Sequence, residues 1–104
     1  MTNLFRVLAD PTRREILAMT ARKECTQSDL VAAFSISQPA IKKHIDLLVS
    51  ENLLLIKKEG KFRYYRLNED MYKLEVQKIQ IELESILDRK LHNLKEYLEE
   101  DNDE

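Results

Sequence analysis

Two helix starts lie close together in the middle of the chain, and the connection between them has to be very short. Thr26 and Asp29 have the spacing of a capping box, with Asp in place of the usual Glu. Ser37 has the side chain of an N-cap, and the first turn of the helix that it opens tolerates Pro39. Between these helices, residues 35–36 leave room only for a tight turn. The pattern therefore predicts a helix-turn-helix.

Apolar spacing adds two helices before this motif and defines its faces. Residues 4–8 predict a short first helix, Asp10 and Pro11 have the pattern that opens a second, and residues 22–25 are expected to form a polar connection. The fourth helix is predicted from Ser37 to about Glu51. The residues expected to face inward are Ile16, Leu17, Met19 or Thr20, Leu30, Val31, Phe34, Ile41, Ile45, Leu48 and Val49. The residues of the fourth helix expected to face outward are Gln38, Lys42, Lys43 and Asp46.

A basic hairpin is predicted directly after the fourth helix. Two strands, Leu53–Lys58 and Lys61–Leu67, flank Glu59 and Gly60. Gly60 is the only glycine of the chain, and a two-residue hairpin loop is where a positive φ is required. The aromatic side chains are expected to be packed: Phe62, Tyr64, Tyr65 and Tyr72. A hairpin in this position predicts a wing, so the expected fold is mainly α with a small β-hairpin wing, a winged helix-turn-helix.

A long final helix is predicted after Asn68, which has the side chain of an N-cap. About 30 residues of helix span about 45 Å, longer than so small a domain can cover. Burial is limited in a chain of this size, so part of the helix should pack on a second copy. The residues expected in this homodimer are Leu4, Phe5, Ile79, Leu83, Leu87, Leu91 and Leu94. The predicted division is a winged helix-turn-helix core over 1–67, a dimerisation helix over 68–99 and a disordered acidic tail over 100–104.

The net charge of −2 hides a strong asymmetry along the chain. Up to Arg66 there are 12 Lys and Arg against 7 Asp and Glu, and from Leu67 onward there are 5 against 12. The first part is therefore basic by 5 charges and the second acidic by 7. A basic body can contact phosphates while the acidic end points elsewhere.

Neither a signal peptide nor a membrane span is indicated by the sequence. The chain begins without a basic segment followed by an apolar one, and no apolar run approaches the ~20 residues of a span. Cys25 is the only cysteine, which excludes an internal disulfide and zinc sites built on paired thiolates. We therefore expect a cytoplasmic protein without membrane contact.

Three stretches, in this order and spacing, resemble the signatures of the ArsR/SmtB family of bacterial winged-helix repressors. They are residues 10–17 (DPTRREIL), 35–44 (SISQPAIKKH) and 60–67 (GKFRYYRL). The resemblance covers Leu4 to Leu67. It implies that the helix from Ser37 enters the major groove of double-stranded DNA.

Gln38 is the main candidate for base readout, because its amide can bond an adenine through two hydrogen bonds. The alternative is an ordinary polar residue in a first helical turn. Lys42 and Lys43 could contact base edges or phosphates, and phosphate contact is the more common type. The further candidates for DNA contact are Thr26, Gln27, Ser37, Ala40 and His44, together with Lys58, Lys61 and Arg63 of the wing. For these wing residues, a solvated edge strand is an equal alternative.

The chain departs from the family pattern at several positions. Ala40 and Lys42 replace small hydroxylated residues, and Ser35 stands where glycine is common in the turn, so base preference is not predicted. The thiolate pair of the metal sensors is missing from residues 28–32. Asp88 and His92 lie four apart but lack further ligands, so a solvated pair is favoured over a metal site. We expect no metal and no cofactor.

His44 and Cys25 each have an ordinary interpretation besides a functional one. His44 is more readily a packing or hydrogen-bonding residue than a metal ligand. Cys25 is either an inert thiol or a redox residue acting through an intersubunit disulfide.

No enzyme is predicted, because the sequence has no glycine-rich phosphate loop and no nucleophile with a base and an orienting group. The predicted function is a sequence-specific DNA-binding transcriptional regulator that represses by occupying an inverted-repeat operator. One alternative is a protein-interaction module that uses the long last helix. Another is a repressor gated by an unidentified small-molecule or redox effector.

Overall fold

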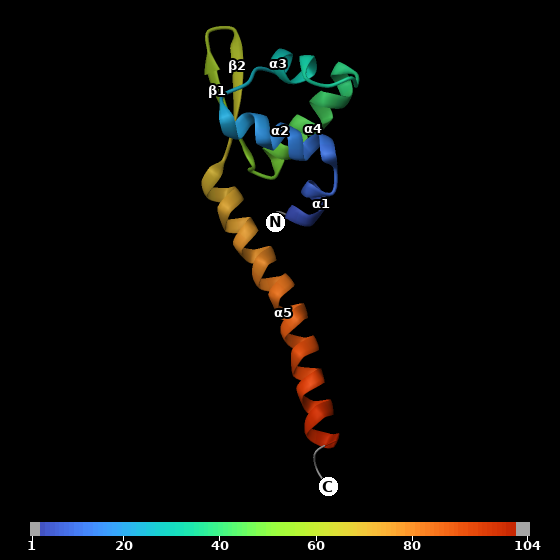
Figure 1. The fold of residues 1–104 in the computed structure, drawn as a ribbon. Coiled ribbons are helices and arrows are strands. Elements are labelled where there is room, and N and C mark those ends of the chain that lie inside the picture. The colour runs from blue at the N-terminus through green and yellow to red at the C-terminus, as the bar shows by residue number, and fades with distance from the viewer. Residues whose placement is uncertain (1–2, 102–104) are drawn as a thin grey trace.

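The computed structural model describes the backbone of residues 3–101 and the side chains of residues 3–89. Its elements follow the predicted order: α1 (Leu4–Leu8), α2 (Pro11–Arg22), α3 (Gln27–Ala32), α4 (Gln38–Ser50), β1 (Leu54–Glu59), β2 (Phe62–Leu67) and α5 (Glu69–Asp101). Four short helices and the hairpin form a head, from which α5 projects (Figure 1). The expected winged helix-turn-helix architecture, mainly α with one hairpin, is confirmed.

The predicted N-caps form the expected hydrogen bonds. Oδ1 of Asp10 accepts from the backbone N–H of Thr12 at 2.7 Å and of Arg13 at 3.3 Å. Thr26 begins α3 with a complete capping box, and Oγ of Ser37 accepts from the backbone N–H of Ala40 at 3.3 Å. These side chains satisfy donors that a helix start leaves unpaired, which is why each helix begins where it does.

The end of α4 depends on a residue that the sequence analysis did not single out. Asn52 has a φ of 61°, in the left-handed region. The N–H of Leu53 donates to the carbonyl of Leu48 at 2.9 Å, and the N–H of Asn52 donates to that of Val49 at 3.0 Å. This pair of bonds is a Schellman motif, in which Asn is one of the few residues tolerated at the left-handed position. It turns the chain from α4 directly into β1.

The hairpin is paired one residue further along than predicted. Glu59 lies opposite Phe62, so the two-residue loop consists of Gly60 and Lys61 rather than Glu59 and Gly60. Gly60 has a φ of 60°, which confirms the expected reason for the glycine. A charged residue such as Glu59 can occupy either the last position of a strand or a loop, so the sequence could not settle this register.

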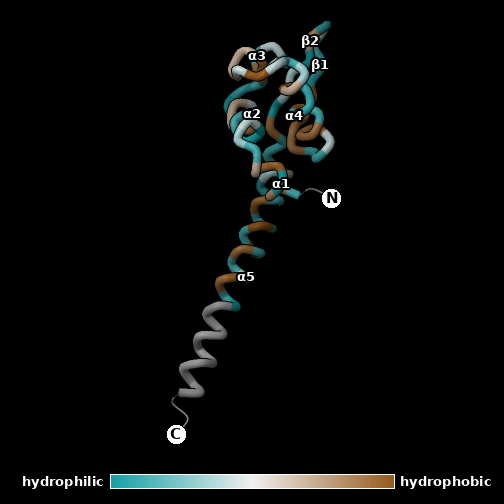
Figure 2. Tube along the Cα trace, turned by 90° about the vertical axis from the view of Figure 1, so that its right-hand side faces the viewer, coloured by the Kyte–Doolittle hydropathy of each residue, from teal (hydrophilic) through white to brown (hydrophobic). Residues whose placement is uncertain are grey.

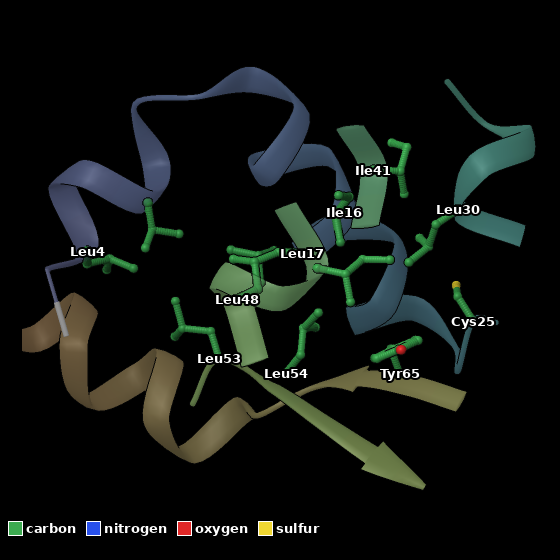
Figure 3. Packing of buried hydrophobic residues seen from close by; sticks show 12 residues of the cluster. Leu4, Ile16, Leu17, Cys25, Leu30, Ile41, Leu48, Leu53, Leu54 and Tyr65 are labelled. Carbon is green, nitrogen blue, oxygen red and sulfur yellow. The ribbon is translucent and has the colours of Figure 1, made fainter. Parts of the chain in front are cut away.

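The core of the head runs through all of its elements (Figure 3). Leu4 of α1 lies at one end, and Cys25 and Tyr65 lie at the other. Cys25 is buried, and its backbone pairs with that of Tyr65 through two hydrogen bonds of 2.9 and 2.7 Å. The prediction of a polar connection over residues 22–25 is therefore wrong at its last residue, which adds a short bridge to the free side of β2.

Asn68 fixes the direction in which α5 leaves the head. Its Oδ1 accepts from the N–H of Met71 at 3.3 Å, which is the predicted cap. In addition, Nδ2 of Asn68 donates to the carbonyl of Asn52 and its backbone N–H donates to that of Leu53, both at 2.9 Å. The helix start is thus bound to the turn after α4. Within the described part of the chain, no helix is long and apolar enough to cross a membrane.

The left-handed conformation of Asn52 predicts an unusual order of stabilities. Asn52→Gly should leave the protein as stable or slightly more stable, whereas Asn52→Ala should destabilise it by about 1 kcal/mol, because a Cβ is strained at this φ. Urea unfolding followed by circular dichroism measures both variants. If alanine were better tolerated than glycine, the assigned conformation would be wrong.

Asp10 predicts a loss of stability in acid. Burial alone would raise the pKa of Asp10, but the N–H groups of Thr12 and Arg13 and the charges of His44 and Arg13 together hold it below its usual 3.8. A lowered folded-state pKa contributes stability above the unfolded value that disappears as the pH falls through the folded one. In unfolding titrations below about pH 5, Asp10→Asn should therefore lose less stability with falling pH than the unchanged protein. An identical pH dependence in both proteins would show that the carboxylate contributes nothing.

Candidate nucleic-acid interface

One hollow on the head gathers side chains from α3, α4 and the hairpin. Its volume is about 200 Å³, and its lining residues are Thr26, Gln27, Ser28, Lys42, Asp46, Lys61, Phe62, Arg63 and Tyr65. Helix α3, the start of α4 and the turn of the hairpin lie at the end of the head away from the tip of α5 (Figure 1). Five of the residues predicted from the sequence to contact DNA therefore meet in one place, although they come from three separate elements.

Helix α4 exposes the side that the sequence predicted. Gln38, Lys42 and Lys43 are exposed, while Ile41, Ile45 and Leu48 on the other side are buried in the core. Of the remaining predicted contacts in this helix, Ser37 is exposed but uses its hydroxyl as the N-cap, and Ala40 is half-buried. The polar side of α4 is consequently free in the single chain.

His44 is held by its own chain. The imidazole is half-buried, and its Nδ1 lies 3.4 Å from Nη1 of Arg13 on α2. Arg13 also donates through Nε to the carbonyl of Val7 at 3.0 Å and through Nη2 to that of Arg6 at 2.8 Å. These bonds connect the end of α1 with α4 through α2. They support the packing and hydrogen-bonding interpretation of His44.

Thr26 and Gln27, the two candidates at the start of α3, differ in whether their hydrogen-bonding groups are already used within the chain. Oγ1 of Thr26 accepts from the N–H of Asp29 at 3.1 Å, and the N–H of Thr26 donates to Oδ2 of Asp29 at 2.9 Å. Hydrogen bonding of the Asp29 carboxylate, first by the backbone N–H and then by the hydroxyl of Thr26, lowers the pKa of Asp29 below its usual value. Both residues line the hollow, but Thr26 is occupied by the capping box, whereas among the described residues no such bond holds the half-buried Gln27 side chain.

The wing presents all three predicted cations to solvent. Lys58, Lys61 and Arg63 are exposed, and Lys58 lies opposite Arg63 in the strand register. Phe62 is 51% exposed, so the prediction that it is packed is wrong. Its ring lies 6.4 Å from that of Tyr64, and Nζ of Lys61 lies 5.7 Å from the ring centroid.

Asp46 is a site residue that the sequence analysis left without a role. It was expected to face outward, and it does, but the structure also places it in the hollow. Its Oδ2 lies 3.0 Å from Nζ of Lys42, one helical turn earlier. The four-residue spacing was the available signal, but charge spacing alone does not show that a pair faces a binding surface.

The residues predicted for dimerisation fall into three groups. Leu4 is 1% exposed and packs within its own chain, so its side chain has no surface left for a second copy. Phe5, Leu83 and Leu87 are 44, 51 and 56% exposed, and Ile79 is half-buried. Leu91 and Leu94 have side chains outside the described residues. Figure 2 shows apolar and polar residues alternating along the described part of α5.

Cys25 is poorly placed for redox chemistry. Burial raises the pKa of its thiol, the charge of Asp29 adds to this, and Lys23 and Arg22 oppose it. Sγ lies 3.4 Å from the carbonyl of Lys23. A protonated, buried thiol is a weak nucleophile, which supports the inert interpretation over an intersubunit disulfide. His92 lies outside the described side chains, so its pairing with Asp88 is a matter of sequence alone.

Comparison with known proteins identifies the family. The family model described as "Bacterial regulatory protein, arsR family" matches residues 10–54. The transcriptional repressor SdpR of Bacillus subtilis is 37% identical over 68 residues, which are 65% of this chain and 76% of that protein. The arsenical resistance operon repressor of Escherichia coli is 44% identical over 66 residues, 62% of this chain and 56% of that protein.

A solved structure shows the same arrangement. The structure of an ArsR-like transcriptional regulator from Rhodococcus sp. RHA1 superposes with a TM-score of 0.78 at 28% identity. The alignment covers 92% of this chain and 87% of that one. The predicted family and the predicted regulatory function are confirmed: the chain belongs to the ArsR family and is a DNA-binding transcriptional repressor.

Proposed function

We propose that the chain represses transcription as a homodimer that occupies an inverted-repeat operator. The observation that carries this proposal is the hollow in which the exposed side of α4 meets the start of α3 and the wing. In it, Lys42, Lys61 and Arg63 provide cations from two elements for one phosphate backbone. A helix with a free polar side, flanked by cations, fits the major groove of B-DNA.

Each element would have a separate task in the complex. Gln38, exposed at the first turn of α4, would read a base edge, and Lys43 would neutralise a phosphate. Gln27 would add a contact from the start of α3. The wing cations Lys58, Lys61 and Arg63 would reach the neighbouring backbone or minor groove. No catalytic step is part of this function. Because its target is operator DNA, the protein would act in the cytoplasm.

The dimer would be built by the elements that the head leaves uncovered. Leu83 and Leu87 expose apolar surface on α5, and Phe5 does so on α1. Residues 1–67 would then hold the DNA-binding core and residues 68–99 the dimerisation helix. Two-fold symmetry would place the two α4 helices about 34 Å apart, in successive major grooves on one side of the duplex.

Substitutions on α4 should separate base readout from phosphate contact. One duplex is selected by the unchanged protein from a random pool, and the other has random sequence. Gln38→Ala should reduce the ratio of the affinities for these two duplexes about tenfold or more, because a bidentate base contact carries about 1–3 kcal/mol of discrimination. Lys43→Ala should weaken binding to both duplexes alike. It should also reduce the slope of the logarithm of the binding constant, log K, against log salt by about 0.9. Fluorescence anisotropy at several salt concentrations measures both quantities. Lys73→Ala, an exposed lysine of α5, is the matched control. Equal losses on both duplexes for both α4 variants would contradict the assignment.

Removing apolar surface from α5 should dissociate the dimer. The double variant Leu83→Gln and Leu87→Gln should shift sedimentation toward the monomer and lower operator affinity, because the apolar surface that associates is lost. Ile81→Gln is the control: this residue is 68% exposed but lies on the opposite side of α5 at 3.6 residues per turn. A monomeric unchanged protein, or equal dissociation by both changes, would argue against this interface.

A further inference from the structure

A negative charge lies in the hollow that the proposed function assigns to a polyanion. Asp46 is exposed and, in the part of the chain that the structure describes, it is the one acid among the residues that line the hollow. Its neighbours there include Lys42, Lys61 and Arg63. A carboxylate at this place repels phosphate and works against the attraction that these cations provide.

Local structure does not account for an Asp at position 46. Helix α4 spans Gln38–Ser50, so Asp46 lies far from the first turn, where the helix dipole would stabilise a negative charge. Asp is also among the weaker helix formers. Its partner Lys42 is 60% exposed and Asp46 itself 62%, and ion pairs at such exposure contribute little to stability. The fold therefore gains little from this pair, and the Asp46 carboxylate remains accessible at the surface of the hollow.

The chemistry of the major groove offers one. An ionised Asp only accepts hydrogen bonds, and the base edges that donate in this groove are the amino groups of cytosine and adenine. The major-groove edge of guanine, the O4 of thymine and the phosphate oxygens are all hydrogen-bond acceptors, so they offer nothing to a carboxylate. Gln38 and Asp46 are eight residues apart in α4, which puts them about 12 Å apart along the helix and about 80° apart around it. Both side chains are exposed on α4, and Asp46 is the one that lines the hollow with the cations.

We propose that Asp46 is a specificity-determining residue, which accepts a hydrogen bond from a cytosine or adenine amino group and rejects other bases and random phosphate contacts. This inference depends on the proposed function. The 3.0 Å contact with Nζ of Lys42 has a second consequence. It holds that ammonium against a carboxylate, so that Lys42 contributes less to sequence-independent binding than a free lysine would.

The test compares Asp46→Asn and Asp46→Glu with the unchanged protein on two probes. One probe is a duplex selected by the unchanged protein from a random pool, and the other is random-sequence duplex of equal length. Asp70→Asn, an exposed acid at the start of α5, is the control with the same change of charge. The selection is then repeated with each variant, because the base preferred opposite position 46 is the readout that a purely structural role would not alter.

Asp46→Asn should bind random duplex about threefold or more tightly. Its log K should fall more steeply with log salt by up to about 0.9, as Lys42 becomes available to one phosphate. Its repeated selection should lose the cytosine or adenine preference at one base pair per half-site, whereas Asp46→Glu and Asp70→Asn should keep it.

Three outcomes would overturn the proposal. In the first, Asp46→Asn increases the affinity for both probes equally and selects the same sequence as the unchanged protein, which would make Asp46 an ordinary surface charge. In the second, Asp46→Asn and Asp70→Asn behave alike. In the third, the unchanged protein fails to bind any duplex at low salt, a result that would remove the proposed function as well and is recognised before any variant is compared.

Discussion

The buried side of α4 is the contact on which the rest of the molecule depends. Ile41, Ile45 and Leu48 are almost completely buried, and each contributes roughly 1.5–3 kcal/mol by leaving water. They belong to one buried cluster with residues from every other element of the head (Figure 3). Because a helix has one orientation once its apolar side is buried, this packing also determines that Gln38, Lys42 and Lys43 point outward. Stability and the binding surface therefore arise from the same contact.

Three backbone turns keep the surroundings of α4 in place. Ser37 begins the helix, Asn52 ends it in a left-handed conformation, and Asn68 then binds the turn that Asn52 makes. The bridge between Cys25 and Tyr65 ties the segment before α3 to β2. Through these connections the start of α3, the side of α4 and the wing become three walls of one hollow. These connections use the backbone and the capping side chains of Ser37 and Asn68, so the exposed side chains of α4 and the wing remain available for a ligand.

Helix α5 serves a different purpose from the four helices of the head. Its first turns pack on the core through Met71, Tyr72, Val76 and Ile79, but Leu83 and Leu87 further along the helix remain exposed. The apolar side of α5 therefore continues beyond the part that packs on the core, and this additional apolar area remains uncovered in one chain. This excess is the physical basis for proposing a second copy. It also explains why a small head can have a long projecting helix without a core of its own.

The sequence by itself determined the order of the elements, the caps at Asp10, Thr26 and Ser37, and the side that α4 exposes. Each of these follows from interactions within a few residues, or from an apolar period that has only one burial solution. The sequence also carried the three family signatures, which lead to the DNA-binding function. Only the tertiary structure decided the register at Gly60, the burial of Cys25, the position of His44 beside Arg13 and the placement of Asp46 in the hollow. These features depend on residues far apart in the chain, and the spacing of residues in one segment carries no information about what another segment brings beside it.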